Sequence, residues 1–170
     1  MKAQEVLLTS KKEQENIMVD ELNVAVDNSE DKSKMVIVMR KDLKMPKGKL
    51  VSQGAHAAVA AILQSIFNVR LSESNFASCV DGFEIKMPAI IDDATKDWLS
   101  GEFTKICLAV NSEEELDNIY NEALKSGLNC SLIVDNGHTV FNGVKTKTGL
   151  AIGPAYSSII DPITKNLPLY

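Results

Sequence analysis

The chain has 170 residues, 45% of them hydrophobic and 24% charged, and carries a formal net charge of −5. This length and balance predict one folded domain with its own core and exclude a collagen-like or wholly disordered chain. No stretch approaches the roughly 20 uninterrupted apolar residues of a membrane-spanning helix, so we expect no membrane partner. The three cysteines (Cys79, Cys107 and Cys130) are odd in number and lack a C-x-x-C spacing, which favours a reducing, cytoplasmic setting.

Residues 1–34 differ in composition from the rest of the chain. They contain eight acidic residues and five lysines, so −3 of the net charge lies here, and they end in a polar run at 28–34. The many acids argue against a transit peptide, and the apolar core of a secretory signal is missing. We therefore predict an acidic, flexible tail. The alternative is an element that docks an unidentified partner protein.

The pattern of a folded domain begins at Met35. Residues 35–39 form a short apolar run rich in β-branched side chains, which predicts a buried strand. Residues 50–67 show the clearest helical period of the chain, with one apolar side. The expected core face of this helix consists of Val51, Ala55, Ala58, Val59, Ile62 and Ile66. Segment 68–101 has no clear period, and 87–91 suits a loop or a short element.

The second half of the chain supplies more strands and one more helix. Residues 104–110 predict a buried strand, and the capping box at 112–115 opens a helix that we expect to end before Gly127. Residues 130–134 and 148–152 predict two further strands. The order strand, helix, strand, helix, strand, strand predicts an α/β fold with a mixed sheet.

Residues 40–49 contain five cations and one acid, at the junction between the first strand and the first helix. Backbone amides and the positive end of a helix collect anions at such a junction, so the segment is a candidate phosphate-binding surface. An ordinary solvated run of charges is the alternative. A phosphate-binding loop of the Walker type is excluded, because Leu43 stands where the first glycine is needed and Leu50 where serine or threonine is needed.

Lys49, Gln53 and His56 follow the basic run at helical spacing, i, i+4 and i+7. They stand nearly opposite the expected core face, and small residues flank them, which leaves room for a bulky ligand. The three side chains combine a cation, an amide that donates and accepts, and a group that titrates near neutrality. A solvated helix face with a structural histidine is the alternative. No carboxylate lies close to His56 in sequence, which disfavours a metal site.

Asp135 directly follows an apolar strand, where the carboxyl edge of a sheet in α/β folds places its ligand-binding groups. Asn136 and Gly137 predict a tight turn after it. Two hydroxyls, Thr139 and Thr148, lie on neighbouring loops or strands. An aspartate with only a turn-forming role is the alternative.

Several separated segments, in this order, resemble the type 2 peptidyl-tRNA hydrolases of archaea and eukaryotes. The similar segments are 35–58, 127–139, 148–154 and 160–170, and the match spans roughly 35–67 and 102–170. On this reading 35–170 is a hydrolase-like domain in which 68–101 is longer than the family norm. The resemblance implies a four-stranded mixed sheet flanked by helices on both faces, in three layers α/β/α, and a homodimer. It also implies that neither metal nor organic cofactor is needed.

The activity that this resemblance implies is hydrolysis of the ester between a peptide and the 3′ ribose of tRNA, which recycles the tRNA. Its catalytic positions would be Lys49, His56, Asp135 and Thr139. Its tRNA- or substrate-binding positions would be Arg40, Lys44, Lys47, Gln53 and Thr148. We expect Asp135 and His56 to orient and deprotonate a water, directly or as a linked pair, while Lys49 stabilises the oxyanion. The alternative is a non-catalytic module of the same fold that binds tRNA or protein.

Overall fold

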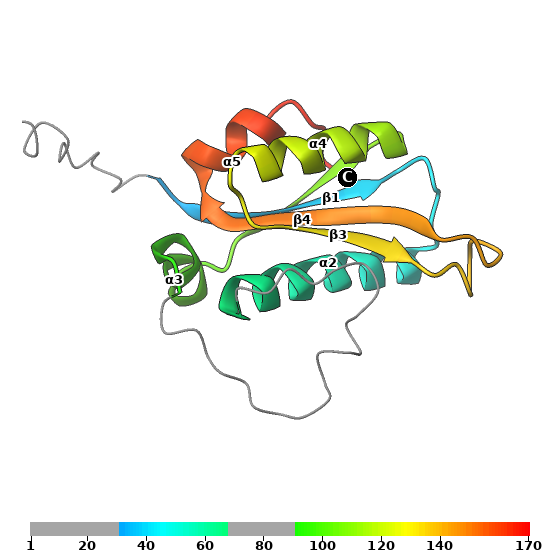
Figure 1. Cartoon of the computed structure of the whole chain (residues 1–170), viewed down its shortest axis with the longest axis horizontal. Coiled ribbons are helices and arrows are strands. Elements are labelled where there is room, and N and C mark those ends of the chain that lie inside the picture. Colours follow the sequence, from blue (N-terminus) through cyan, green and yellow to red (C-terminus); the bar gives the residue numbers. More distant parts are fainter. Residues whose placement is uncertain (1–30, 68–90) are drawn as a thin grey trace, which may run out of the picture. The chain divides into compact units, whose positions relative to one another are not determined.

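The computed structural model describes residues 31–67 and 91–170, and a four-stranded sheet in the order β2-β1-β4-β3 lies at the centre of this part (Figure 1). Its strands are β1 (Ser33–Arg40), β2 (Lys105–Val110), β3 (Cys130–Asp135) and β4 (Thr146–Tyr156). β1 pairs with β2 in parallel, and β4 runs antiparallel to both β1 and β3. The carboxyl ends of β1, β2 and β3 therefore meet at one edge, and the predicted mixed sheet is confirmed.

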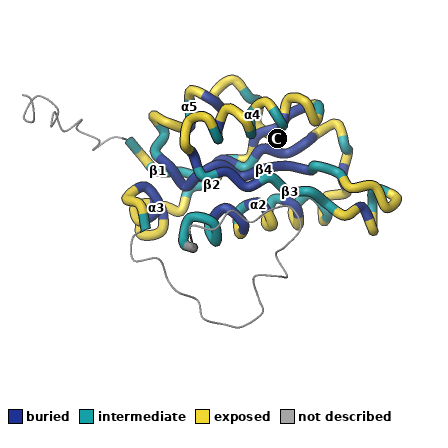
Figure 2. Tube along the Cα trace, in the orientation of Figure 1, coloured by how far each residue is buried: buried dark blue, intermediate teal, exposed yellow. Residues whose placement is uncertain are grey.

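Helices cover both faces of this sheet. α2 (Lys47–Phe67) and α3 (Asp93–Ser100) lie on one face, and α4 (Glu113–Lys125) and α5 (Ser157–Thr164) lie on the other (Figure 1). The alternation along β1 separates two cores, because Met35 packs with α2 and α3 whereas Val36 and Val38 pack towards α4 and α5. Figure 2 shows the strands as the most buried layer. The predicted three-layer α/β/α arrangement is confirmed.

The ends of α4 follow from its local sequence. The Ser112 hydroxyl accepts a hydrogen bond from the Glu115 amide at 3.0 Å, as the capping box predicts. At the other end Gly127 has φ +72°, and the amides of Gly127 and Leu128 bond back to the carbonyls of Leu124 and Ala123. This is a Schellman motif, so the predicted end of the helix before the glycine is correct.

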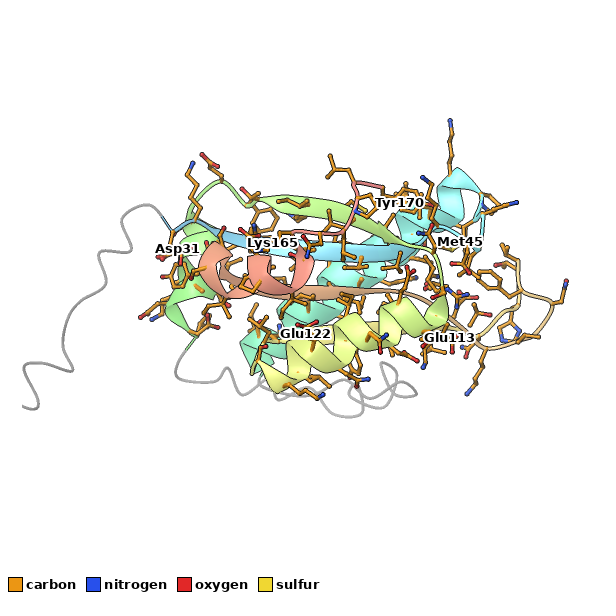
Figure 3. The ribbon with its side chains drawn as sticks, turned by 90° about the horizontal axis from the view of Figure 1, so that it is seen from above. Asp31, Met45, Glu113, Glu122, Lys165 and Tyr170 are labelled. Atoms are coloured by element: carbon orange, nitrogen blue, oxygen red, sulfur yellow. The ribbon has the colours of Figure 1, made fainter. Side chains whose placement is uncertain are left out.

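Two helices were not expected from the sequence, and their caps explain why. In α3 the Asp92 carboxylate accepts hydrogen bonds from the Thr95 amide and hydroxyl at 2.8 and 2.7 Å. This cap was the only local sign of the short helix, because segment 68–101 shows no clear hydrophobic period. The start of α5 has no side-chain cap of its own. Instead Asp31, which is 127 positions away in sequence, accepts from the Ser158 amide at 3.0 Å (Figure 3).

Residues 31–34 belong to the folded domain, although the composition had placed them in the acidic tail. Besides the Asp31 cap, the Lys32 carbonyl accepts from the Ser157 amide and hydroxyl. The Lys34 ammonium contacts the Asp161 carboxylate at 2.5 Å, and β1 already begins at Ser33. The charged residues Asp31 and Lys34, which the sequence analysis had assigned to a linker, therefore connect the start of β1 to α5. The rest of the predicted tail, 1–30, lies outside the described residues, as does 68–90.

The predicted core face of α2 is wrong. Val51 and Val59 are 71% and 52% exposed, whereas Gln53 is 3% exposed and Ala57 and Ala61 are completely buried against the sheet. The remaining members of the expected face are exposed (Ala55) or half-buried (Ala58, Ile62 and Ile66). Trp98 and Met35 fill part of the space beneath the helix, so the side turned to the sheet carries small residues. Of the expected face, Ala58 and Ile62 still pack against this core, whereas Val51 and Val59 face outward.

The outer edge of β2 is covered by the last described residues of the chain. The Ala109 amide donates to the Pro168 carbonyl at 2.9 Å, and the Tyr170 amide donates to the Cys107 carbonyl at 3.1 Å. An isolated antiparallel bridge joins Leu108 to Leu169 between them. An uncovered edge strand invites pairing with other chains, and this short segment occupies part of it.

Candidate active site

The residues singled out from the sequence gather at the carboxyl edge of the sheet. The loop after β1, the start of α2, the start of α4 and the turn after β3 all lie at this end (Figure 1). Met45 and Glu113 mark the same end in Figure 3. Three parallel strands end at this edge, β1 at Arg40, β2 at Val110 and β3 at Asp135. Segments that are far apart in the sequence therefore meet on one surface.

Asp135 is the centre of this cluster. Its carboxylate accepts hydrogen bonds from Gln53 Nε2 at 2.9 Å, from the Gly137 amide at 2.8 Å and from the Lys49 ammonium. The side chains of Asp135 and Lys49 are only 12% and 16% exposed. The pairing of β3 with β4 shifts register between Ile133 and Val134, just before the aspartate, which changes the direction of the strand's last side chains.

The environment of Asp135 lowers the pKa of its carboxyl. Burial alone would raise the pKa, but the hydrogen bonds from Lys49, the Gly137 amide and Gln53, together with the Lys49 charge, outweigh burial. The group is therefore an ionised acceptor near neutral pH. A carboxylate that already accepts from three donors holds its neighbours in place and is a poor proton acceptor.

A buried hydroxyl fixes the amide of Gln53. Thr148 is fully buried on β4, and its Oγ1 donates to Gln53 Oε1 at 2.6 Å. With its oxygen held in this way, the amide turns its nitrogen to Asp135. The chain Thr148–Gln53–Asp135 thus joins β4, α2 and β3. Next to it, Gly149 packs so closely on Val38 that an added Cβ would lie 2.7 Å from the Val38 carbonyl oxygen.

The Lys49 ammonium lies between Asp135 and the loop that follows it. Its second hydrogen bond goes to Thr139 Oγ1 at 3.4 Å, and its Nζ lies 5.9 Å from the centroid of the Phe141 ring. Five of the residues predicted from the sequence therefore form one hydrogen-bonded cluster: Lys49, Gln53, Asp135, Thr139 and Thr148. Its accessible groups are the ammonium and the exposed Thr139 hydroxyl.

His56 lies on α2 outside this cluster. It is exposed, and its Nε2 is 3.4 Å from the Ser52 hydroxyl one turn earlier. Within residues 31–67 and 91–170, no hydrogen bond joins it to Asp135. Of the two arrangements expected from the sequence, the linked His–Asp pair is not formed in this structure, because the helix turns Gln53, and not His56, towards the carboxylate.

Arg40 does not face solvent as expected. It is 8% exposed, and its guanidinium contacts Asp42 at 2.6 Å and Glu113 at 2.9 Å, which ties β1 to α4. The guanidinium thus has partners within the fold, and the tRNA contact of Arg40 stays a prediction. Lys44 and Lys47, by contrast, are exposed and have no ion pair within the described part of the chain. Lys44 also has φ +47°, the left-handed region, at the turn before α2.

Two contacts of the cluster were not predicted from the sequence, those of the Gly137 amide and of Phe141. The Gly137 amide was recognised only as part of a tight turn, although its donation to Asp135 follows from that turn. Phe141 belongs to no motif that the sequence analysis recognised. For the two cysteines among the described residues a nucleophilic role is disfavoured, because burial raises the pKa of Cys107 and raises the pKa of Cys130 to about 12. In the described residues no group of three or more His, Cys, Asp or Glu side chains is arranged to hold a metal ion.

The structure thus defines a three-layer α/β protein that carries a hydrogen-bonded cluster of Lys49, Asp135 and Thr139 at the carboxyl edge of its sheet. Residues 33–170 match the protein family described as peptidyl-tRNA hydrolase PTH2. The chain belongs to this family.

Similar proteins occur in archaea and eukaryotes. The chain is 40% identical over 136 residues to a peptidyl-tRNA hydrolase of Methanocaldococcus jannaschii, covering 80% of this chain and 98% of that protein. It is 35% identical over 136 residues to a peptidyl-tRNA hydrolase of Sulfolobus acidocaldarius, with the same two coverages. It is 35% identical over 139 residues to a probable peptidyl-tRNA hydrolase 2 of Drosophila melanogaster, covering 82% of this chain and 62% of the fly protein.

Proposed function

We propose that this protein hydrolyses the ester bond between a peptide and the 3′ end of tRNA, releasing free tRNA and the peptide. Membership of the family and the names of the relatives support this function. The observation that carries it is the Lys49 ammonium, held between the Asp135 carboxylate and Thr139 on the edge where exposed lysines gather. Cleavage of an ester needs a positioned water and a stabilised oxyanion, and this cluster offers a cation for the second task.

In the proposed reaction a water oxygen bonds to the ester carbonyl carbon while Lys49 stabilises the negative charge on the carbonyl oxygen. The bond between that carbon and the ribose 3′ oxygen then breaks. The proton removed from water ends on the 3′ oxygen, which leaves a peptide carboxyl group and a 3′ hydroxyl. We assign the transfer of this proton to His56, because Asp135 already accepts three hydrogen bonds and its pKa is lowered. Thr139 holds the water or the carbonyl.

Exposed lysines next to the cluster supply the proposed tRNA contact. Lys44 and Lys47 precede Lys49 on the loop and first turn of α2, and Lys145 is exposed on the loop between β3 and β4. Their charge is local, since the whole chain carries −5. Phosphate contacts of this kind position the nucleic acid without reading its sequence. The buried Gln53 and Thr148 position Asp135, because Thr148 holds the Gln53 amide and that amide donates to the carboxylate.

We further propose a homodimer in which two copies of α2 pack through their outer faces. From Leu50 to Phe67 the helix contains no charged residue, and Val51, Ala55 and Val59 are exposed on it. Exposed apolar side chains that gather on one helix face mark a surface that another chain can cover, and here the polar Ser52 and His56 border them. Small residues such as Ala55 let two helices approach closely.

The setting of the protein is part of the same proposal. No helix among the described residues is long and apolar enough to cross a membrane. We propose a cytoplasmic enzyme. Its N-terminal tail, which lies outside the described residues up to 30, stays predicted as a flexible segment, and docking of another protein is its alternative role. A chain without residues 1–30 tests that role, because it would keep hydrolase activity and lose the partner.

The decisive experiment measures release of label from an N-acetyl-aminoacyl-tRNA, in excess EDTA, beside the same tRNA with a free amino group. We expect cleavage of the blocked substrate alone. Lys49→Met should lower kcat by at least a hundredfold, as removal of one oxyanion donor does in other hydrolases. Lys165→Met changes an exposed lysine directly after α5 and is the matched control. Retained tRNA binding without cleavage would favour the non-catalytic module.

A further inference from the structure

The loop after Asp135 brings an aromatic ring to the reactive ammonium. Phe141 is half-buried, and its ring centroid lies 5.9 Å from Lys49 Nζ. Trp98 and Phe103 lie elsewhere: their ring centroids are 3.8 Å apart, and the Lys105 ammonium at the start of β2 lies over both rings. Phe141 is therefore an aromatic ring that contacts a member of the site cluster.

The loop presents this ring from a closed frame. The Gly143 amide donates to the Gly137 carbonyl at 3.0 Å, and the Val144 amide donates to the Phe141 carbonyl at 2.9 Å. Gly137 has φ +82°, and a Cβ added there would lie 2.4 Å from the Val144 carbonyl oxygen, so only glycine allows the closure. Because these bonds are internal, the loop places Phe141 before any ligand arrives, which lowers the ordering cost of binding.

The substrate proposed above carries an aromatic group where the ring is found. In an ester of tRNA the reacting carbonyl hangs from the ribose of the terminal nucleotide, and the nucleobase hangs from the same ribose. When the carbonyl oxygen lies against Lys49 Nζ, the base is one sugar away, on the scale of the distance from Nζ to the Phe141 ring.

We propose that Phe141 is the stacking platform for the 3′-terminal nucleobase of the tRNA. This inference rests on the proposed function, and it adds the group that sets the ribose, and with it the ester, against Lys49. Aromatic side chains bind single-stranded ends of RNA in this manner, and the contact tolerates any base because every base has a π-face. The exposed lysines hold the phosphates while the ring fixes the last nucleotide.

The kinetic test compares Phe141→Ala, Phe141→Trp and the control Val144→Ala on two forms of N-acetyl-aminoacyl-tRNA. One form has its terminal adenine and the other has an abasic terminal ribose. We expect Phe141→Ala to raise KM about tenfold on the intact form with kcat nearly unchanged, and to have no effect on the abasic form. Phe141→Trp and Val144→Ala should behave like the parent. An equal fall in kcat on both forms would instead make the ring a support for Lys49 and overturn the proposal.

A second readout needs no catalysis and so separates the two proposals. Deacylated tRNA with 2-aminopurine as its terminal base changes its fluorescence when that base stacks. The parent protein should change this emission on binding, and Phe141→Ala should bind without the change. A parent that cleaves no ester yet shows the change would refute the hydrolase and keep the platform. A parent that cleaves but shows the same emission as Phe141→Ala would refute the platform alone.

Discussion

Three donors from two segments of the chain converge on the carboxylate of Asp135, and this convergence gives each neighbouring residue its place. Lys49 and Gln53 come from successive turns of α2, and the Gly137 amide comes from the turn after β3. Lys49 is thus paired with a fixed charge and directed to Thr139. A cation held in this way needs little reorganisation when an oxyanion forms beside it.

The hydrogen bond from Thr148 to Gln53 predicts an effect on activity from a residue that substrate never touches. Thr148→Val keeps the shape but leaves Gln53 Oε1 buried without a donor, at a cost of about 1–3 kcal/mol. The amide then turns, releases Asp135, and kcat falls about tenfold while KM stays near that of the parent. Thr146→Val is the matched control, since that hydroxyl bonds only the Val144 carbonyl. Parental kcat in Thr148→Val would contradict the positioning role.

The lowered pKa of Asp135 predicts how stability depends on pH. A carboxyl whose pKa is lower in the folded chain stabilises the fold above the pKa of the unfolded chain, about 3.9, and loses that contribution as pH falls through the folded value. Asp135→Asn should therefore melt below the parent at pH 7, and the difference should shrink only below about pH 4. Melting curves of both proteins from pH 3 to 8 measure this. A difference that already shrinks between pH 7 and 5 would mean that Asp135 is not held ionised.

At the scale of elements, local sequence signals were enough to predict a helix or strand when the residues that start and end it lie within its own sequence. The four strands were expected within a few residues of their bounds, because each contains a short apolar run. α4 was expected with both ends because its caps, Ser112 and Gly127, lie within its own sequence. α5 was missed because Asp31 caps it from the other end of the domain.

α2 shows the opposite case, in which a strong local pattern gave the wrong orientation. Its larger apolar side chains predicted the buried face, yet tertiary packing selects alanines and Gln53, since the sheet beneath leaves room for small groups and offers Thr148 and Asp135 as partners. The set of site residues was nonetheless predicted, because each stood in a recognisable place. Their partners were not, because the rotation of one helix decides whether Gln53 or His56 meets the carboxylate.

At the scale of the described domain, the sheet order explains how one edge holds the whole site. Three strands run parallel and β4 returns between β1 and β3, so the loops after β1 and β3 lie on either side of Thr148. The polar site occupies one end, and the uncharged outer face of α2 leads away from it. The start of α2 bears Lys47 and Lys49, so the same helix contributes to the proposed tRNA surface and to the proposed contact between copies.

The proposed dimer predicts a mass and a variant that changes it. Sedimentation should give the parent twice the chain mass of 18.6 kDa. Val59→Glu places a charge where the second copy packs, and an unpaired charge in an apolar interface opposes association, so this variant should sediment as a folded monomer. Leu99→Glu, at a 42% exposed position of α3, is the matched control and should stay dimeric. Val59→Glu with parental mass would move the contact elsewhere, and a parent that sediments as a monomer would remove the dimer from the proposal.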